Sequence, residues 1–252
     1  TMGIKAAANE TLLFTDADCR PLSPNWVRKM QAGYREEATE IVLGVSPYEK
    51  KGGLLNAFIR YEAFYTALNY LSFALAGRPY MGVGRNLSYK KSLFFKQKGF
   101  ASHLHLRSGD DDLFVNQAAG KGNTRIVTSA EAQTMSEAER TWADYIRQKQ
   151  RHQSVGKYYK AGHKFHLALL PGAVVLSYAC LAILWVQGWD LRWLAAPAGL
   201  KWVVQYIIFR PVMRSTNAGD LWLFLPFFDL AYHLYIVLIN LFPVSPEKVQ
   251  WK

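Results

Sequence analysis

Two groups of aspartates could bind a metal ion and move a proton. Asp16 and Asp18 are separated by one residue, and residues 110–112 form a run of three aspartates later in the chain. Carboxylates with a D-x-D spacing can share one divalent cation with the oxygens of a diphosphate, because Mg²⁺ and Mn²⁺ prefer oxygen ligands. A carboxylate of the second group could then act as a general base. Together, the two groups indicate chemistry on a diphosphate substrate.

A third segment could hold the leaving group of such a reaction. Gln148 and Arg151 are three residues apart, so both side chains lie on one face of a helix. The planar, permanently charged guanidinium of Arg151 is suited to a diphosphate. A single pair with this spacing usually belongs to a solvated helix face, but its position behind two acidic groups favours a binding role.

An α/β fold would bring these segments together. Residues 11–15 are typical of a strand buried in a parallel sheet, and Asp16 follows at the edge where open α/β sheets bind ligands. Residues 80–84 predict a strand that delivers Arg85 and Asn86 to the same edge. Residues 110–119 predict a helix, whose acidic start would also be explained by simple capping.

We also expect a helix end at residues 4–9, a helix from Ser23 that buries Trp26, Val27, Met30 and Tyr34, strands at 41–45 and 124–128 (the latter at the sheet edge), and helices at 91–98 and 138–152.

The segment Leu54–Leu75 is nearly as apolar as a membrane span, but four polar side chains interrupt it: Asn56, Arg60, Glu62 and Asn69. Its apolar residues form a helical stripe. The sequence leaves two interpretations open. The helix either packs on the sheet or lies at the bilayer surface, where it would admit a lipid-linked acceptor.

The last third of the chain has the composition of a membrane domain. Residues 165–186 and 221–242 are each long enough to cross a bilayer as a helix, whereas residues 191–209 are fewer and include Arg192 and Lys201. We therefore predict a catalytic domain at residues 1–164, and a membrane domain with two to three hydrophobic helices at residues 165–252.

The net charge of +11 fits a membrane better than a nucleic acid. Basic residues crowd before the first apolar run, which follows the positive-inside rule and suits anionic headgroups. The chain has only two cysteines, Cys19 and Cys180, which we expect to lie too far apart in the fold to bridge, so it fits a reducing compartment. We expect a multi-pass protein of the cell membrane with a cytoplasmic catalytic domain and no nucleic-acid partner. Three crossings would place Lys248 and Lys252 outside, so residues 191–209 or the segment around Asp229 should lie along the interface or inside the bundle.

Taken in order, these segments resemble the family 2 glycosyltransferases, membrane-bound sugar transferases with a Rossmann-like GT-A fold. The matching residues are Asp16 and Asp18 for the metal-binding D-x-D segment, Gly84, Arg85 and Asn86 for the substrate-binding G-x-N segment, Asp110, Asp111 and Asp112 for the catalytic E-D segment, and Gln148, Arg151 and His152 for the substrate-binding Q-x-x-R-W motif. His152 replaces the usual Trp, and an Asp replaces the usual Glu. The run of aspartates leaves the register open, with Asp111 favoured as the base and Asp110 second.

The resemblance implies an inverting transfer of a sugar from a nucleotide-sugar, with a UDP-sugar favoured, to a lipid-linked or polysaccharide acceptor at the cytoplasmic membrane face. It also implies a divalent metal, Mg²⁺ or Mn²⁺. The alternative is a membrane-anchored, non-catalytic protein that binds a nucleotide or a partner. In the family a first strand and loop precede the D-x-D strand, so we expect the N-terminal strands to be missing from this chain, with an unpaired edge left at residues 11–15.

Overall fold

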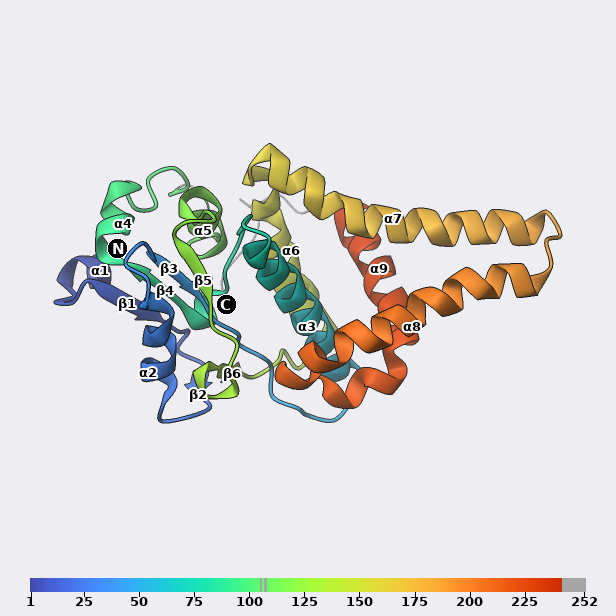
Figure 1. The fold of residues 1–252 in the computed structure, drawn as a ribbon, viewed down its shortest axis with the longest axis horizontal. Coiled ribbons are helices and arrows are strands. Elements are labelled where there is room, and N and C mark those ends of the chain that lie inside the picture. The colour runs from blue at the N-terminus through green and yellow to red at the C-terminus, as the bar shows by residue number, and fades with distance from the viewer. Residues whose placement is uncertain (105, 107, 242–252) are drawn as a thin grey trace.

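The computed structural model describes residues 1–104, 106 and 108–241. It contains a mixed four-stranded sheet with the strand order β1-β4-β3-β5 (Figure 1). The strands are β1 (Thr11–Phe14), β3 (Ile41–Leu43), β4 (Leu87–Lys90) and β5 (Thr124–Ile126). Because β4 is antiparallel to both neighbours and β5 is parallel to β3, strands β1, β3 and β5 all point the same way. Their carboxyl ends therefore meet at one edge of the sheet.

Two of the expected strands differ from the structure. Strand β1 is an edge strand paired antiparallel with β4, not a strand inside a parallel sheet, and only Leu12 of its four residues is buried. Residues 80–84 do not form a strand; β4 begins after Asn86 instead. Since β4 runs opposite to its neighbours, its amino end lies at their carboxyl ends. Arg85, which precedes β4, therefore lies at the expected edge although residues 80–84 form no strand.

Helices cover both faces of the sheet, because side chains alternate along each strand. Ile41 and Leu43 of β3 point into the larger core, whereas Val42 packs against Met30 on the opposite face. The covering helices are α2 (Trp26–Gln31), α4 (Lys91–Lys96) and α5 (Asp112–Ala118), and a short helix α1 (Met2–Ala6) precedes β1. Helix α2 starts after Asn25, whose backbone N–H donates to the Ser23 hydroxyl at 3.1 Å, and Val27 is exposed.

A second, two-stranded ribbon was not predicted. Strand β2 (Cys19–Pro21) pairs antiparallel with β6 (Thr134–Ser136) and includes the residue next to Asp18. Both strands have three residues, too few for an alternating pattern to stand out in the sequence.

Helix α3 (Leu54–Leu75) lies between the sheet and the C-terminal helices (Figure 1). One side, with Tyr70 and Leu71, belongs to the sheet core, and the other, with Tyr61 and Phe64, packs in an aromatic cluster against the C-terminal helices. The interpretation as a helix packed on the sheet is therefore confirmed.

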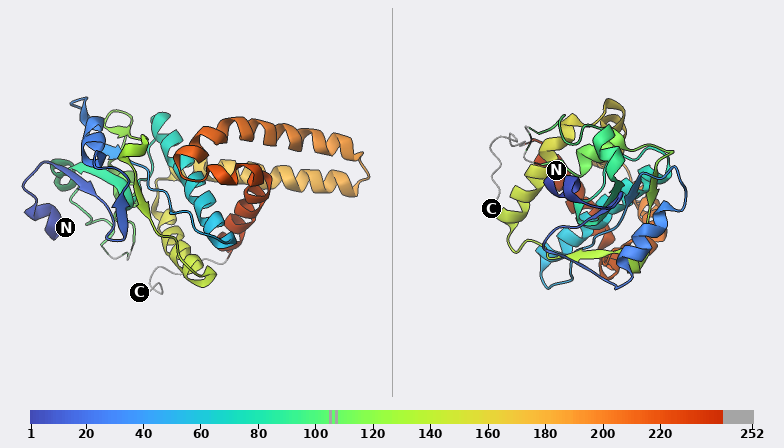
Figure 2. Two further views of the ribbon diagram at one scale, coloured as in Figure 1. Left: turned by 90° about the horizontal axis from the view of Figure 1, so that it is seen from below. Right: turned by 90° about the vertical axis from the view of Figure 1, so that its left-hand side faces the viewer.

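The C-terminal helices extend away from the sheet. Helix α6 (Trp142–Val155) starts four residues later than predicted, capped by the Thr141 hydroxyl, which accepts from the Asp144 N–H at 3.2 Å. Helices α7 (Ala161–Val186) and α8 (Leu191–Ser215) form a long hairpin, and α9 (Leu225–Leu241) crosses between them near its base (Figures 1 and 2).

In the part of the chain that the structure describes, two segments are long and apolar enough to cross a membrane, Ala161–Val186 and Gly219–Leu241. Only 6% of the most apolar stretch of the first is buried in the protein. Helix α8 does not qualify, and it carries Arg192, Lys201 and Arg210. The tail with Lys248 and Lys252 lies outside the described residues.

The three C-terminal helices meet at a buried polar cluster around Asp229. The Asp229 carboxylate of α9 is fully buried and accepts from Tyr178 of α7 at 3.1 Å and from Gln205 of α8 at 3.0 Å. The Lys201 ammonium forms an ion pair with the same carboxylate. One side chain on α9 thus ties together both helices of the hairpin.

Candidate active site

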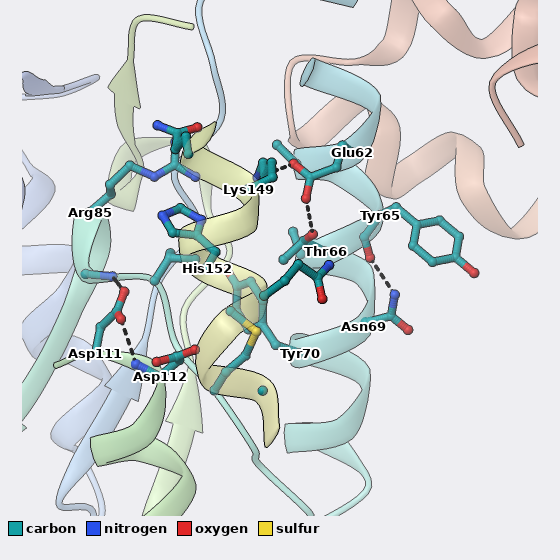
Figure 3. A pocket seen from close by; sticks show the side chains of 18 of the residues that line it. Glu62, Tyr65, Thr66, Asn69, Tyr70, Arg85, Asp111, Asp112, Lys149 and His152 are labelled. Atoms are coloured by element: carbon teal, nitrogen blue, oxygen red, sulfur yellow. Dashed lines mark hydrogen bonds and ion pairs between the residues drawn. The ribbon is translucent and has the colours of Figure 1, made fainter. Parts of the chain in front are cut away.

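A cavity of about 1290 Å³ begins at the edge where β1, β3 and β5 end and continues between α3, α6, α7 and α9. It brings together segments that are far apart in the sequence (Figure 3). The predicted site residues that line it are Asp16, Asp18, Gly84, Arg85, Asp110, Asp111, Asp112, Gln148, Arg151 and His152.

Asp16 and Asp18 follow β1 directly and face this cavity. Ligand atoms of Asp16, Asp18 and Cys19 lie within 4.8 Å of one another, close enough to share one ion. Desolvation raises the pKa of the exposed Asp16 carboxyl, and the negative charge of Asp18 raises it further. Burial also raises the pKa of the half-buried Cys19 thiol. The two carboxylates offer oxygen ligands. This oxygen set fits Mg²⁺ or Mn²⁺.

Arg85 places a positive charge beside the two aspartates, and charge interactions link its guanidinium to Asp16. The guanidinium stacks over the Tyr48 ring at 4.3 Å. Among the described residues, the buried Nη1 of Arg85 has no hydrogen-bond partner. Leaving a buried charged donor unsatisfied is costly, so an anion such as a phosphate oxygen fits this position.

The start of α5 holds a half-buried carboxylate, Asp111, next to a buried one, Asp112. The Asp111 carboxylate caps the helix: Oδ1 accepts from the Asp112 N–H at 2.7 Å, and Oδ2 accepts from the Gly84 N–H at 2.6 Å. Burial raises the pKa of Asp111, and the charge of Asp110 raises it further. Burial and the charge of Asp111 raise the pKa of Asp112 in the same way. Both groups therefore take up protons closer to neutral pH than ordinary carboxylates.

Tyr159 connects this acidic pair to the start of the first membrane-type helix. Its hydroxyl donates to Oδ2 of Asp112 at 2.6 Å, while Oδ1 of Asp112 accepts from the Leu113 N–H at 2.8 Å. Nearby, the Lys160 N–H donates to the Asn116 side chain of α5 at 3.0 Å. The carboxylates are thus positioned both from the sheet and from the segment that leads into α7.

Helix α6 contributes Gln148, Arg151 and His152 to the cavity, as their helical spacing predicts. Desolvation inside the cavity lowers the pKa of His152 well below its usual value, and the positive charges of Lys149 and Arg151 lower it further. The imidazole is therefore neutral at physiological pH and can accept or donate a hydrogen bond, but it does not carry the positive charge of the site.

Asn86 is the one predicted substrate residue that does not line the cavity. Its side chain is fully buried. Its amide nitrogen donates to the carbonyls of Val45 and Ala132 at 2.8 Å each, and its oxygen accepts from the Trp26 indole at 3.0 Å. In the structure Asn86 holds three loops together behind Arg85.

No protein-family model matches the chain, and no curated protein matches it. Among solved structures it is similar to the mannosyltransferase PcManGT from Pyrobaculum calidifontis in complex with GDP-Man and Mn²⁺. The two share 17% sequence identity with a TM-score of 0.53 over 96% of this chain. The chain therefore shares its fold with this mannosyltransferase structure. It spans 65% of the length of the mannosyltransferase chain.

Three residues with close contacts in the cavity lining were not predicted as site residues: Glu62, Lys149 and Tyr159. Glu62 of α3 pairs with Lys149 of α6 at 2.6 Å, and Tyr159 binds Asp112. Glu62 gave a signal, because a carboxylate inside a nearly apolar helix needs a buried partner. The short segment that holds Tyr159 has no spacing pattern that would reveal its contact.

Proposed function

We propose that the protein transfers a sugar from a nucleotide-diphosphate sugar to an acceptor hydroxyl at a membrane face, with inversion at the anomeric carbon. One observation carries the proposal. A metal-type carboxylate pair, a buried guanidinium with an unsatisfied N–H, and a carboxylate with a raised pKa line the same cavity although they come from separate segments.

The donor would occupy the end of the cavity next to the sheet. Asp16 and Asp18 would hold a divalent ion, which when bound helps to neutralise charge on the diphosphate. Arg85 and Arg151 would bind phosphate oxygens, and Gln148 would add a hydrogen bond from the same face of α6. The similar mannosyltransferase was solved with GDP-Man, so GDP-sugars and UDP-sugars are both donors to test.

Asp111 would act as the base. The N–H groups of Gly84 and Asp112 orient its carboxylate, and the raised pKa makes it a stronger base than an ordinary aspartate. As the acceptor oxygen bonds to the anomeric carbon, its proton passes to Asp111. The bond to the diphosphate breaks on the opposite side, and its electron pair leaves with the nucleotide. Attack opposite the leaving group inverts the anomeric centre, and no covalent enzyme intermediate is needed.

Residues 1–164 would form the transferase domain and residues 165–252 the membrane domain of a multi-pass protein, with the transferase domain in the cytoplasm. Lys157, Lys160 and Lys164 cluster at the start of the first candidate span. This is the side on which the positive-inside rule places cytoplasmic segments.

The direct test incubates membranes that contain the full-length protein with a panel of UDP-sugars and GDP-sugars plus Mn²⁺, and measures released nucleotide. We expect release with one donor and loss of Mn²⁺-dependent donor binding in Asp18→Ala, while the exposed Glu37→Ala behaves like wild type. Donor binding without any release would instead select a non-catalytic nucleotide-binding protein. Unchanged Mn²⁺-dependent affinity in Asp18→Ala would contradict the metal assignment.

A further inference from the structure

The cavity continues past the proposed donor site into a second region, which we call the inner chamber and define by Glu62, Thr66, Asn69 and Lys149. Figure 3 shows Asp111 and Asp112 on one wall, with α3 carrying Glu62, Thr66 and Asn69 on the other. The total volume of about 1290 Å³ exceeds the roughly 300–1,000 Å³ that is usual for one small-molecule site. The cavity therefore has room for a second substrate beside a nucleotide-sugar.

Three side chains of α3 give the inner chamber a row of oxygen atoms. Glu62, Thr66 and Asn69 follow one another at helical spacing and line the cavity. The Thr66 hydroxyl donates to Oε1 of Glu62 at 3.2 Å, and the Asn69 amide nitrogen donates to the Tyr65 carbonyl at 2.8 Å. The hydroxyl oxygen of Thr66 and the carbonyl oxygen of Asn69 are thus left to accept from a ligand. Sugar hydroxyls can donate to such a row, whereas a fully ionised phosphate has only acceptor oxygens.

The cation in the inner chamber is already neutralised. Lys149 Nζ lies 2.6 Å from Oε2 of Glu62, and both side chains are about 10% exposed. A phosphate would have to separate this nearly buried pair and stand next to the Glu62 carboxylate. Removing one partner of such a pair is strongly unfavourable, because the other charge is left uncompensated.

The outer end of the inner chamber faces the membrane-type helices. Leu167, Leu170 and Pro171 of α7 and Ile236 of α9 line the cavity there. Leu170 is 48% exposed on a helix that is long and apolar enough to cross a bilayer. Lys164 of α7 also lines the cavity, and its ammonium donates to the Lys157 carbonyl at 3.1 Å. An acyl or prenyl chain could therefore leave the cavity between α7 and α9 into lipid.

We infer that the inner chamber receives a lipid-linked acceptor whose head carries uncharged sugar hydroxyls, and that the Glu62–Lys149 pair discriminates against a lipid whose head is a phosphate. The inference rests on the proposed transferase activity for its chemistry, but the preference for one lipid head over the other can be measured as binding alone. Glu62 is thus a specificity-determining residue, and Lys149 positions its carboxylate.

The test uses the full-length protein in nanodiscs and two lipid probes, a glucosyl-diacylglycerol and a polyprenyl phosphate, with binding measured in the absence of donor. Wild type should bind the glycolipid and reject the phosphate. Glu62→Gln frees Lys149, so glycolipid affinity should fall roughly tenfold or more and phosphate affinity should rise. The exposed Glu131→Gln, which lies outside the cavity lining, should match wild type.

If Glu62→Gln does not fold, Asn69→Leu provides a second test, because it removes part of the oxygen row and leaves the ion pair intact. It should lose glycolipid affinity without gaining affinity for the phosphate. Equal or stronger binding of polyprenyl phosphate by wild type would overturn the inference, as would an unchanged preference in both variants. Failure of the proposed activity would show up separately, as absent Mn²⁺-dependent nucleotide-sugar binding in a protein that still discriminates between the two lipids.

Discussion

The carboxylates at the start of α5 and the carboxylate at the junction of the C-terminal helices have opposite surroundings. At the start of α5, Asp111 and Asp112 stand side by side, held by backbone N–H groups and the Tyr159 hydroxyl. At the junction of the C-terminal helices, Asp229 forms an ion pair with Lys201 and accepts from two further side chains. In the first arrangement two neighbouring carboxylates are held by neutral donors. In the second, the ammonium of Lys201 neutralises the negative charge of Asp229.

This difference separates the proposed base at the start of α5 from a structural ion pair at Asp229. Neutral donors orient Asp111 and Asp112 while burial keeps both pKa values raised, as a base requires. A lysine and two neutral donors hold Asp229 at the junction of the three helices. Charged residues inside membrane-type helices typically pair in this way.

The largest effect is expected from Asp111→Asn. The substitution keeps the size and most hydrogen bonds of the side chain but removes its basicity. Sugar transfer should fall by about 10²–10⁴-fold, with donor affinity unchanged. Rates of nucleotide release and donor titration would measure the two quantities. Normal transfer by Asp111→Asn, with loss of transfer in Asp110→Asn, would identify Asp110 as the base in place of Asp111.

Asp229→Leu should be the most damaging single change for stability. It leaves Lys201 without its carboxylate among packed helices, which costs about 3–5 kcal/mol. The double variant with Lys201→Met should recover most of the loss, because two apolar side chains need no partner. Thermal unfolding in detergent measures both variants. Equal destabilisation of the single and double variants would mean that the ion pair is not the source of the loss.

The acidic pair predicts opposite pH slopes for activity and stability. Since folding raises the pKa of both carboxyls above the ordinary value of 3.8, their contribution to stability is full below that value and is lost as pH rises through the folded values. Transfer should increase over the same interval, as Asp111 loses its proton. Rate and unfolding profiles measured in one buffer series would show the two trends crossing.

Tyr159→Phe should move that rate profile by a smaller amount. The Tyr159 hydroxyl lowers the pKa of Asp112, so its removal should keep Asp112 protonated to higher pH. Less negative charge would then lie beside Asp111, and the acidic limb should shift to lower pH by less than about one pH unit. Tyr158→Phe is the matched control, since Tyr158 is exposed and next in the chain. A uniform loss of rate with an unmoved profile would indicate that Tyr159 only supports the fold.

The smallest effect is expected where an ion pair is exposed. Glu36 pairs with Arg125 on the surface between the segments around α2 and β5. Water and salt screen such pairs, so Glu36→Gln should leave both the unfolding temperature and the transfer rate unchanged within error. A clear loss in either would show that burial is not what distinguishes the two carboxylate sites from the rest of the charges.

Much of this arrangement was predictable from sequence because it depends on local patterns. The helix Leu54–Leu75 has the bounds that its composition suggests, and spacing on α6 places Gln148 and Arg151 on one face. The direction of β4 was not predictable, since four residues carry no signal for parallel or antiparallel pairing. Asn86 was assigned to the substrate for lack of the tertiary contacts that bury it. The Glu62–Lys149 pair joins two helices 87 positions apart, a distance that no local pattern can bridge.

The far wall of the cavity, formed by α7 and α9, has a consequence for the assay of the proposed sugar transfer. If the acceptor enters through that wall, the donor arrives from water and the acceptor arrives from a two-dimensional phase. The rate would then follow the mole fraction of acceptor in the bilayer and not its amount per volume of buffer. Adding inert lipid at constant amounts of donor and acceptor should slow turnover, because it dilutes the acceptor within the bilayer. Adding lipid-free buffer should lower only the concentration of donor.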